Sequence, residues 1–218
     1  MAGTLHKFNL TIHHSQSLKA IAKFFTYAFH PLLLPTYSFM LVIYTNPFLF
    51  GNYGAYTWIP IVKVFLNTFL FPVFSILLMR QLGLIKSFTM DDAKERIAPY
   101  IATLMFYIWT FMVFRKSGDP TLLSVVMLGA CLSASIASII NLFRKISLHA
   151  TGMGALIGLA FGNAVFSVHD LIFSLMIVAI IAGIVGTSRL ILNAHKDSDV
   201  YLGYFVGFMA QVVAFKFL

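Results

Sequence analysis

The chain has 218 residues, of which 60% are hydrophobic and only 10% are charged. A soluble domain carries about 25% charged residues, so the composition excludes an ordinary soluble protein and predicts one that lies in a membrane. The net charge of +8 comes from 15 basic residues against 7 acidic ones. The basic residues lie in short loops between apolar segments, which excludes nucleic acid and favours membrane lipids with anionic or phosphorylated headgroups as partners.

The N-terminal segment, residues 1–30, is predicted to be a polar stretch followed by a helix on the membrane surface. Within residues 17–28 the apolar side chains fall on one side, and Lys19 and Lys23 fall on another. This separation is typical of an interfacial amphipathic helix. Residues 31–218 are expected to form a single transmembrane helix-bundle domain.

Apolar runs of about 20 residues recur along this second part, and each is long enough to cross a bilayer. The sequence therefore predicts an all-α, polytopic integral membrane helix bundle with six to seven transmembrane helices. The expected spans are residues 31–50, 58–79, 97–114, 121–143, 150–168, 171–187 and 200–217. Glycines recur every four residues on the fifth and seventh spans, which predicts closely packed helices.

Three polar clusters follow the second, fourth and sixth expected spans. They are residues 91–96, 144–149 and 188–199. Because two crossings separate each cluster from the next, all three are expected on the same face of the membrane. Their convergence predicts a site at the membrane surface.

The third cluster carries the clearest chemical pattern. His195 and Asp199 are four residues apart, so on a helix they would share one face, where the carboxylate could orient the imidazole. Arg189 adds a guanidinium that suits an anion, and such a set equips a nucleophile that attacks phosphate. The alternative is a charged loop at the membrane exit with a surface histidine.

This cluster resembles a motif of the type-2 phosphatidic acid phosphatase superfamily, which consists of integral membrane lipid phosphatases. The family motif is Ser-Arg, five residues, His, three residues, Asp. It is complete here as Ser188, Arg189, His195 and Asp199. The resemblance covers roughly residues 86–210 and implies a helical membrane enzyme.

The family's two other motifs are divergent in this chain. The second, Pro-Ser-Gly-His, keeps Ser147 and His149 but has Leu148 in place of glycine. The first, Lys, six residues, Arg-Pro, keeps Arg96 but has Thr89 in place of lysine. Leucine restricts the approach of the backbone to a phosphate, and the threonine removes one cation.

The resemblance implies a reaction through a phosphohistidine intermediate. His195 would attack the phosphorus, and Asp199 would fix its tautomer and stabilise its charged form. His149 would protonate the leaving oxygen and then accept a proton from the attacking water.

The resemblance also implies which groups hold the phosphate. Arg189 and Arg96 would bind the phosphate oxygens. Ser147 and the backbone at the start of the fifth span would add hydrogen bonds, although a serine there is also a common helix cap. Lys94 or Lys145 is a candidate to replace the missing lysine. Two guanidiniums supply the positive charge, so no metal or other cofactor is expected.

The implied substrates are phosphorylated lipids such as phosphatidic acid, phosphatidylglycerol phosphate or polyprenyl diphosphates. The alternative is a catalytically degenerate lipid-phosphate-binding or transport protein. A transporter places polar groups near the bilayer midplane, whereas the polar residues here concentrate at one surface. The sequence leaves the lipid tail and the oligomeric state open.

The expected location is a bacterial inner (cytoplasmic) membrane, with the site on the periplasmic side by analogy with such enzymes. The positive-inside rule points to the cytoplasm instead, because 11 of the 15 basic residues lie on the cluster side. When six candidate phosphate-binding residues are left out, five basic residues remain on the cluster side and four on the opposite side. The membrane face of the site therefore stays open.

Two further polar residues in apolar surroundings are expected to be structural. Lys63 lies near the end of its span, where its side chain reaches the surface. His30 precedes a proline at the membrane boundary.

Overall fold

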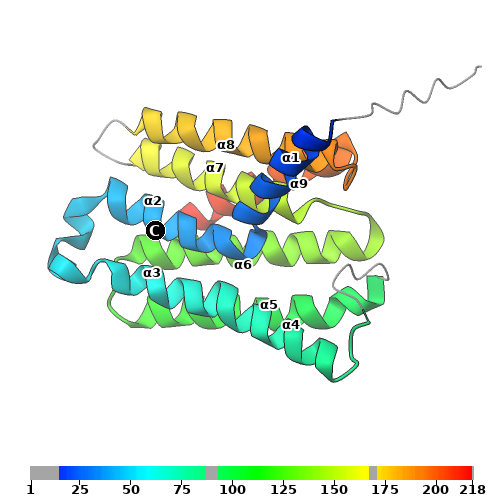
Figure 1. Cartoon of the computed structure of the whole chain (residues 1–218). Helices are drawn as coiled ribbons and strands as arrows, with labels where there is room; N and C mark the ends of the chain where they lie inside the picture. The colour runs from blue at the N-terminus through cyan, green and yellow to red at the C-terminus, as the bar shows by residue number, and fades with distance from the viewer. Residues whose placement is uncertain (1–14, 87–92, 167–170, 218) are drawn as a thin grey trace, which may run out of the picture.

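The computed structural model describes residues 15–86, 93–166 and 171–217. Regular structure in these ranges is helical, and the expectation of an all-α polytopic bundle is confirmed (Figure 1). Seven stretches of it are long and apolar enough to cross a membrane. The helices are α1 (Gln16–Ala28), η1 (Pro31–Leu33), α2 (Leu34–Thr45), η2 (Pro47–Tyr56), α3 (Trp58–Phe65), η3 (Leu66–Leu70), α4 (Phe71–Gln81), α5 (Ala93–Lys116), α6 (Thr121–Phe143), α7 (Leu148–Phe166), α8 (Ile172–Ile191), α9 (Asp197–Ala214) and η4 (Phe215–Phe217).

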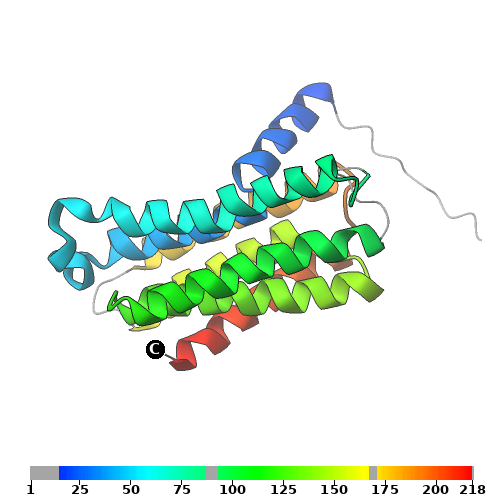
Figure 2. The same ribbon diagram turned by 90° about the horizontal axis from the view of Figure 1, so that it is seen from below.

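The N-terminal helix α1 is separated from α2 by a break at His30. The ring of Pro31 disfavours helical geometry in the residue before it, and His30 is extended, with φ −62° and ψ 139°. Helix α1 packs on α8 and leans out of the bundle (Figure 2). Its outer side exposes Phe24 and Tyr27 together with Lys23. The stretch Gln16–Thr45, which includes α1, is itself one of the seven candidate spans, so the interfacial position of α1 stays a prediction.

Prolines also alter the first two expected spans. The first was expected to reach residue 50, but α2 ends at Thr45, because Pro47 cannot donate a helical hydrogen bond and restricts Asn46. The second contains the π-helical turn η3, which precedes Pro72. A proline at this position removes the bond to the carbonyl four residues earlier, and the wider turn accommodates that loss.

Helices α7 and α9 form the closest contact in the bundle. A Cβ atom on Gly207 would lie 1.8 Å from the carbonyl oxygen of Thr151, and one on Gly154 would lie 2.3 Å from that of Tyr204. The glycine spacing predicted closely packed helices, and this contact agrees with that prediction. The contact fixes the start of α7 against the start of α9, where Ser147 N–H donates to the carbonyl of Asp199 at 3.2 Å.

The expected common face is also present. The start of α5, the connection between α6 and α7, and the connection between α8 and α9 all lie at one end of the bundle (Figure 1). This end is called the cluster end below. The connections 46–57 and 117–120 lie at the opposite end.

Candidate functional site

The third cluster does not lie on one helix, so the expected shared helix face of His195 and Asp199 is wrong. Helix α8 ends before Asn193, whose φ of +50° is in the left-handed region that terminates helices. His195 lies in the connection, and α9 begins at Asp197 after an extended Lys196. The fold nevertheless brings His195 Nδ1 to 3.8 Å from Asp199 Oδ2.

Asp199 has two roles at this position. Its Oδ2 accepts a hydrogen bond from Lys196 N–H at 3.1 Å, which caps the start of α9. The 3.8 Å separation from His195 exceeds a hydrogen bond, so the carboxylate acts on the imidazole through its charge. Burial lowers the pKa of His195 below 6.5, Arg189 and Lys145 lower it further, and Asp199 opposes them. The imidazole is therefore neutral at neutral pH, as a nucleophile must be.

The second cluster holds Ser147 and His149 at the start of α7. Ser147 is fully buried, and its Oγ accepts the Ala150 N–H at 3.3 Å as a helix cap. His149 Nε2 lies 3.1 Å from the carbonyl oxygen of Thr26 on α1. Because a carbonyl only accepts, Nε2 carries the proton and Nδ1 is the free ring nitrogen in the neutral form.

The cationic residues come from three parts of the chain. Arg189, in the last turn of α8, has a buried Nε without a hydrogen-bond partner among the described residues. Arg96, in the first turns of α5, donates to Asn141 Oδ1 at 3.5 Å. Lys145 lies in the connection before α7. Lys94 begins α5 as well, but its side chain lies outside the described residues.

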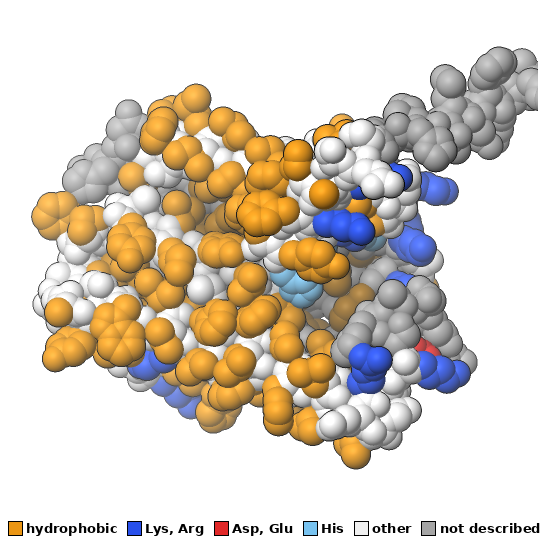
Figure 3. Space-filling model, viewed as in Figure 1, with side chains coloured by type: hydrophobic (Ala, Val, Ile, Leu, Met, Phe, Trp, Pro, Cys, Tyr) orange, Lys and Arg blue, Asp and Glu red, His pale blue; other side chains and the backbone are white. Residues whose placement is uncertain are grey.

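These cations line a cavity of about 540 Å³ at the cluster end. Its polar end is formed by three cations and three histidines: Arg96, Lys145, Arg189, His30, His149 and His195. Within the described part of the chain, no acidic side chain lines it. In Figure 3 histidine is visible beside the hollow below α1, with several basic side chains around this end. A site with this charge favours an anionic ligand.

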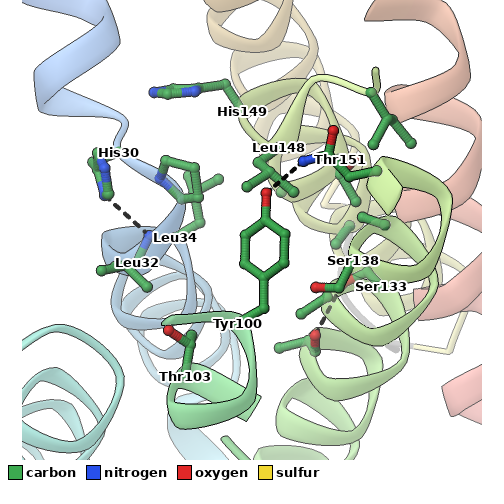
Figure 4. A pocket seen from close by; sticks show the side chains of 18 of the residues that line it. His30, Leu32, Leu34, Tyr100, Thr103, Ser133, Ser138, Leu148, His149 and Thr151 are labelled. Carbon is green, nitrogen blue, oxygen red and sulfur yellow. Dashed lines mark hydrogen bonds between the residues drawn. The ribbon is translucent and has the colours of Figure 1, made fainter. Parts of the chain in front are cut away.

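The cavity continues from its polar end between the helices. Figure 4 shows Tyr100 of α5 projecting into it, with Leu32 and Leu34 on one side and Ser133 and Ser138 of α6 on the other. Further apolar side chains, including Tyr107, Val126 and Ala130, line the deeper part. An anionic group at the mouth can therefore be joined to an apolar chain within the bundle.

His30 also lines this cavity, although it was expected from the sequence to be only structural. A signal existed, because His30 precedes the first span and so lies on the same face as the three clusters. No family motif drew attention to it. Its place depends on the break between α1 and α2, which brings its ring to His149, with ring centroids 5.7 Å apart.

Four expected site residues thus meet at one cavity. Asp199 lies behind His195, and Ser147 is a buried cap outside the lining. The four are His195, His149, Arg189 and Arg96. Comparisons with protein-family models, with curated proteins and with solved structures find no match to this chain. The side chains and geometry of the cavity are therefore the features that bear on its function.

Proposed function

We propose that this protein is a metal-independent lipid phosphatase that hydrolyses a phosphomonoester or diphosphate through a phosphohistidine intermediate. The observation that carries the proposal is the cavity itself. Three cations and three imidazoles gather at its mouth, no described acidic side chain opposes them, and the cavity continues between apolar helices. A phosphorylated headgroup with an apolar tail matches both parts.

The nucleophile in this proposal is His195. Its Nδ1 faces Asp199, which leaves Nε2, on the other side of the ring, to attack phosphorus. The bond from Nε2 to phosphorus forms as the bond to the leaving oxygen breaks. The Asp199 carboxylate favours the positive charge that the ring gains. Water then attacks the phosphohistidine, releases phosphate and restores the free imidazole.

The second histidine, His149, supplies the proton to the leaving oxygen. Its Nε2–H is bound to the carbonyl of Thr26, so Nδ1 of the neutral ring is unprotonated. Nδ1 therefore first takes the proton of the substrate's monoanionic phosphate and then passes it to the leaving oxygen. After the leaving group departs, the same nitrogen accepts a proton from the attacking water.

The phosphate oxygens are held by the guanidiniums of Arg189 and Arg96. The Nε–H of Arg189, which has no partner in the part of the chain that the structure describes, is a donor available to a bound anion. Lys145 lines the mouth of the cavity and takes the place of the cation that Thr89 does not provide. Positive charge around the transferred phosphoryl group stabilises its transition state without a metal ion.

The substrate class is a membrane lipid with a terminal phosphate, such as phosphatidic acid, phosphatidylglycerol phosphate or a polyprenyl diphosphate. The location proposed with it is a bacterial inner membrane, with the cluster end facing the periplasm. Cysteine labelling of intact cells tests that face. In a Cys131→Ala background, Gln81→Cys at the cluster end should react with an impermeant maleimide, and Ala55→Cys at the opposite end should not. The reverse pattern would place the site in the cytoplasm.

The function is tested by phosphate release from phosphatidic acid and from a polyprenyl diphosphate, using detergent-purified protein with EDTA present. We expect release by the wild type and loss of at least about a thousandfold in His195→Ala, because the nucleophile is removed. Trapping of acid-labile phosphate on the wild type but not on the variant identifies the intermediate. Release that survives the substitution would contradict the mechanism.

A second candidate is a protein that binds lipid phosphate without hydrolysing it. The bond between His149 and Thr26, which occupies one nitrogen of the proposed acid, favours this candidate. Folded wild-type protein that binds inorganic phosphate in calorimetry but releases none from either lipid would establish it.

A further inference from the structure

His30 has a defined hydrogen-bonding pattern at the break between α1 and α2. Its Nδ1 accepts the backbone N–H of Leu32 at 3.3 Å, which caps the short helix η1. A backbone N–H only donates, so Nδ1 is unprotonated and the proton of the neutral ring resides on Nε2. The capping bond thus leaves His30 with a donor on the far side of its ring.

The ring that carries this donor belongs to the cavity wall. His30 lines the cavity, and its ring meets the ring of His149 edge to face at 83°. Figure 4 shows one ring nitrogen bound to the backbone of η1 and the other turned away from it. Arg189 is near enough to act electrostatically on both histidines.

We propose that His30 is a substrate-binding residue whose Nε2–H donates a hydrogen bond to an oxygen of the bound phosphate. This inference rests on the proposed function and adds a residue outside the three motif clusters. Arg189 provides charge and a donor from α8, and His30 provides an uncharged donor from the α1–α2 break. A neutral donor strengthens the binding of an anion without adding a positive charge that would repel Arg189.

The competing explanation is that His30 only caps η1, and two substitutions separate the explanations. In His30→Asn the side-chain oxygen takes the position of Nδ1, and asparagine is a good helix cap. This variant keeps the cap and loses the Nε2 donor. In His30→Gln the amide nitrogen reaches the position of Nε2, so the donor is kept and the cap is lost.

The experiment measures kcat, KM and Tm for both variants in detergent, together with calorimetric titration of inorganic phosphate. We expect His30→Asn to keep the wild-type Tm while KM and the phosphate Kd rise about tenfold, the effect of one lost hydrogen bond to an anion. We expect His30→Gln to stay within about threefold of the wild type in both constants. Wild-type constants in His30→Asn would overturn the proposal, with or without a lower Tm in His30→Gln.

The phosphate titration separates failure of this inference from failure of the proposed function. If the wild type binds phosphate but releases none, the phosphatase is rejected, and the Kd of His30→Asn still decides the role of His30. If the wild type releases phosphate and His30→Asn equals it, only the role of His30 is rejected. Wild-type protein that neither binds nor releases phosphate overturns both.

Discussion

Polar side chains differ in their hydrogen-bond pairing between the two ends of the bundle. At the opposite end, Asn46 donates to Asn163 at 3.0 Å, and Asn163 donates to Thr45 at 2.8 Å. At the cluster end, Arg189 Nε and His195 Nδ1 are buried without hydrogen-bond partners among the described residues. A buried polar group without a partner costs about 1–3 kcal/mol. Under the proposed function a bound phosphate completes Arg189 Nε, and Asp199 faces His195 Nδ1, so the difference separates a structural end from the proposed site.

The loops at the opposite end also have polar side chains that are hydrogen-bonded to one another, as Asn46 and Asn163 are. Tyr53 and Ser117 both donate to the carboxylate of Asp119 and join η2 to the connection between α5 and α6. Burial raises the pKa of the Tyr53 hydroxyl, and the hydrogen bond to Asp119 raises it further. The hydroxyl therefore remains protonated and acts as a donor. This network holds the loops together.

The largest expected contrast comes from one arginine at each end. Arg189→Gln should lower kcat/KM about a hundredfold, because a charge-assisted bond to phosphate contributes about 1.5–3 kcal/mol. Arg115→Gln, a matched change of an exposed residue at the opposite end, should leave kcat/KM unchanged. Initial rates on mixed micelles measure both. Equal losses would show a general charge effect and would remove the distinction between the ends.

The second contrast uses two aspartates. Asp199→Asn keeps an oxygen that can accept from Lys196 N–H but removes the charge beside His195. Its kcat should fall about tenfold, since the carboxylate stabilises the charged ring electrostatically and not through a hydrogen bond. Asp119→Asn at the other end should keep the wild-type kcat. A normal kcat in Asp199→Asn would leave that residue only its capping role.

The third contrast concerns stability at the opposite end. Asn163→Ala should lower the free energy of unfolding by about 1 kcal/mol, the usual contribution of an interhelical hydrogen bond in a membrane protein. Its kcat/KM should not change. Thermal unfolding in detergent measures the first effect, with His195→Ala as the control whose Tm should not fall. A large loss of activity in folded Asn163→Ala protein would mean that the two ends are coupled.

The smallest expected effect is a shift in pH dependence. Burial lowers the pKa of His195, so the acid limb of kcat/KM should lie below pH 6.5. Lys145→Gln removes a cation that lowers this pKa and should move the limb to higher pH. Asp199→Asn removes the anion that raises it and should move the limb to lower pH. Shifts in the opposite directions would contradict the assignment of this limb to His195.

Much of the architecture follows from the sequence. Apolar run length predicted six to seven membrane-crossing helices, the glycine spacing predicted closely packed helices, and counting crossings placed the three clusters at one end. These predictions succeed because bilayer thickness and close helix contact restrict composition directly. They needed no knowledge of side-chain positions.

The site was less predictable because its details depend on where helices end. The left-handed Asn193 separates His195 from the helix that carries Asp199, and helix spacing alone did not show that break. His30 reaches the cavity only through the break before Pro31 and the packing of α1 on α8. Ser147 matched a motif, yet its hydroxyl is used as a helix cap. Local backbone geometry decided each of these cases.

The tight contact of α7 with α9 has a consequence for which parts of the bundle can move. A carbonyl of α7 at Thr151 lies where a side chain on Gly207 would begin, so these two helices cannot slide past one another without a clash. The first turns of α7 and α9, which carry His149 and Asp199, are therefore held in fixed register. Under the proposed function, a lipid would enter and leave by movement of helices outside this pair.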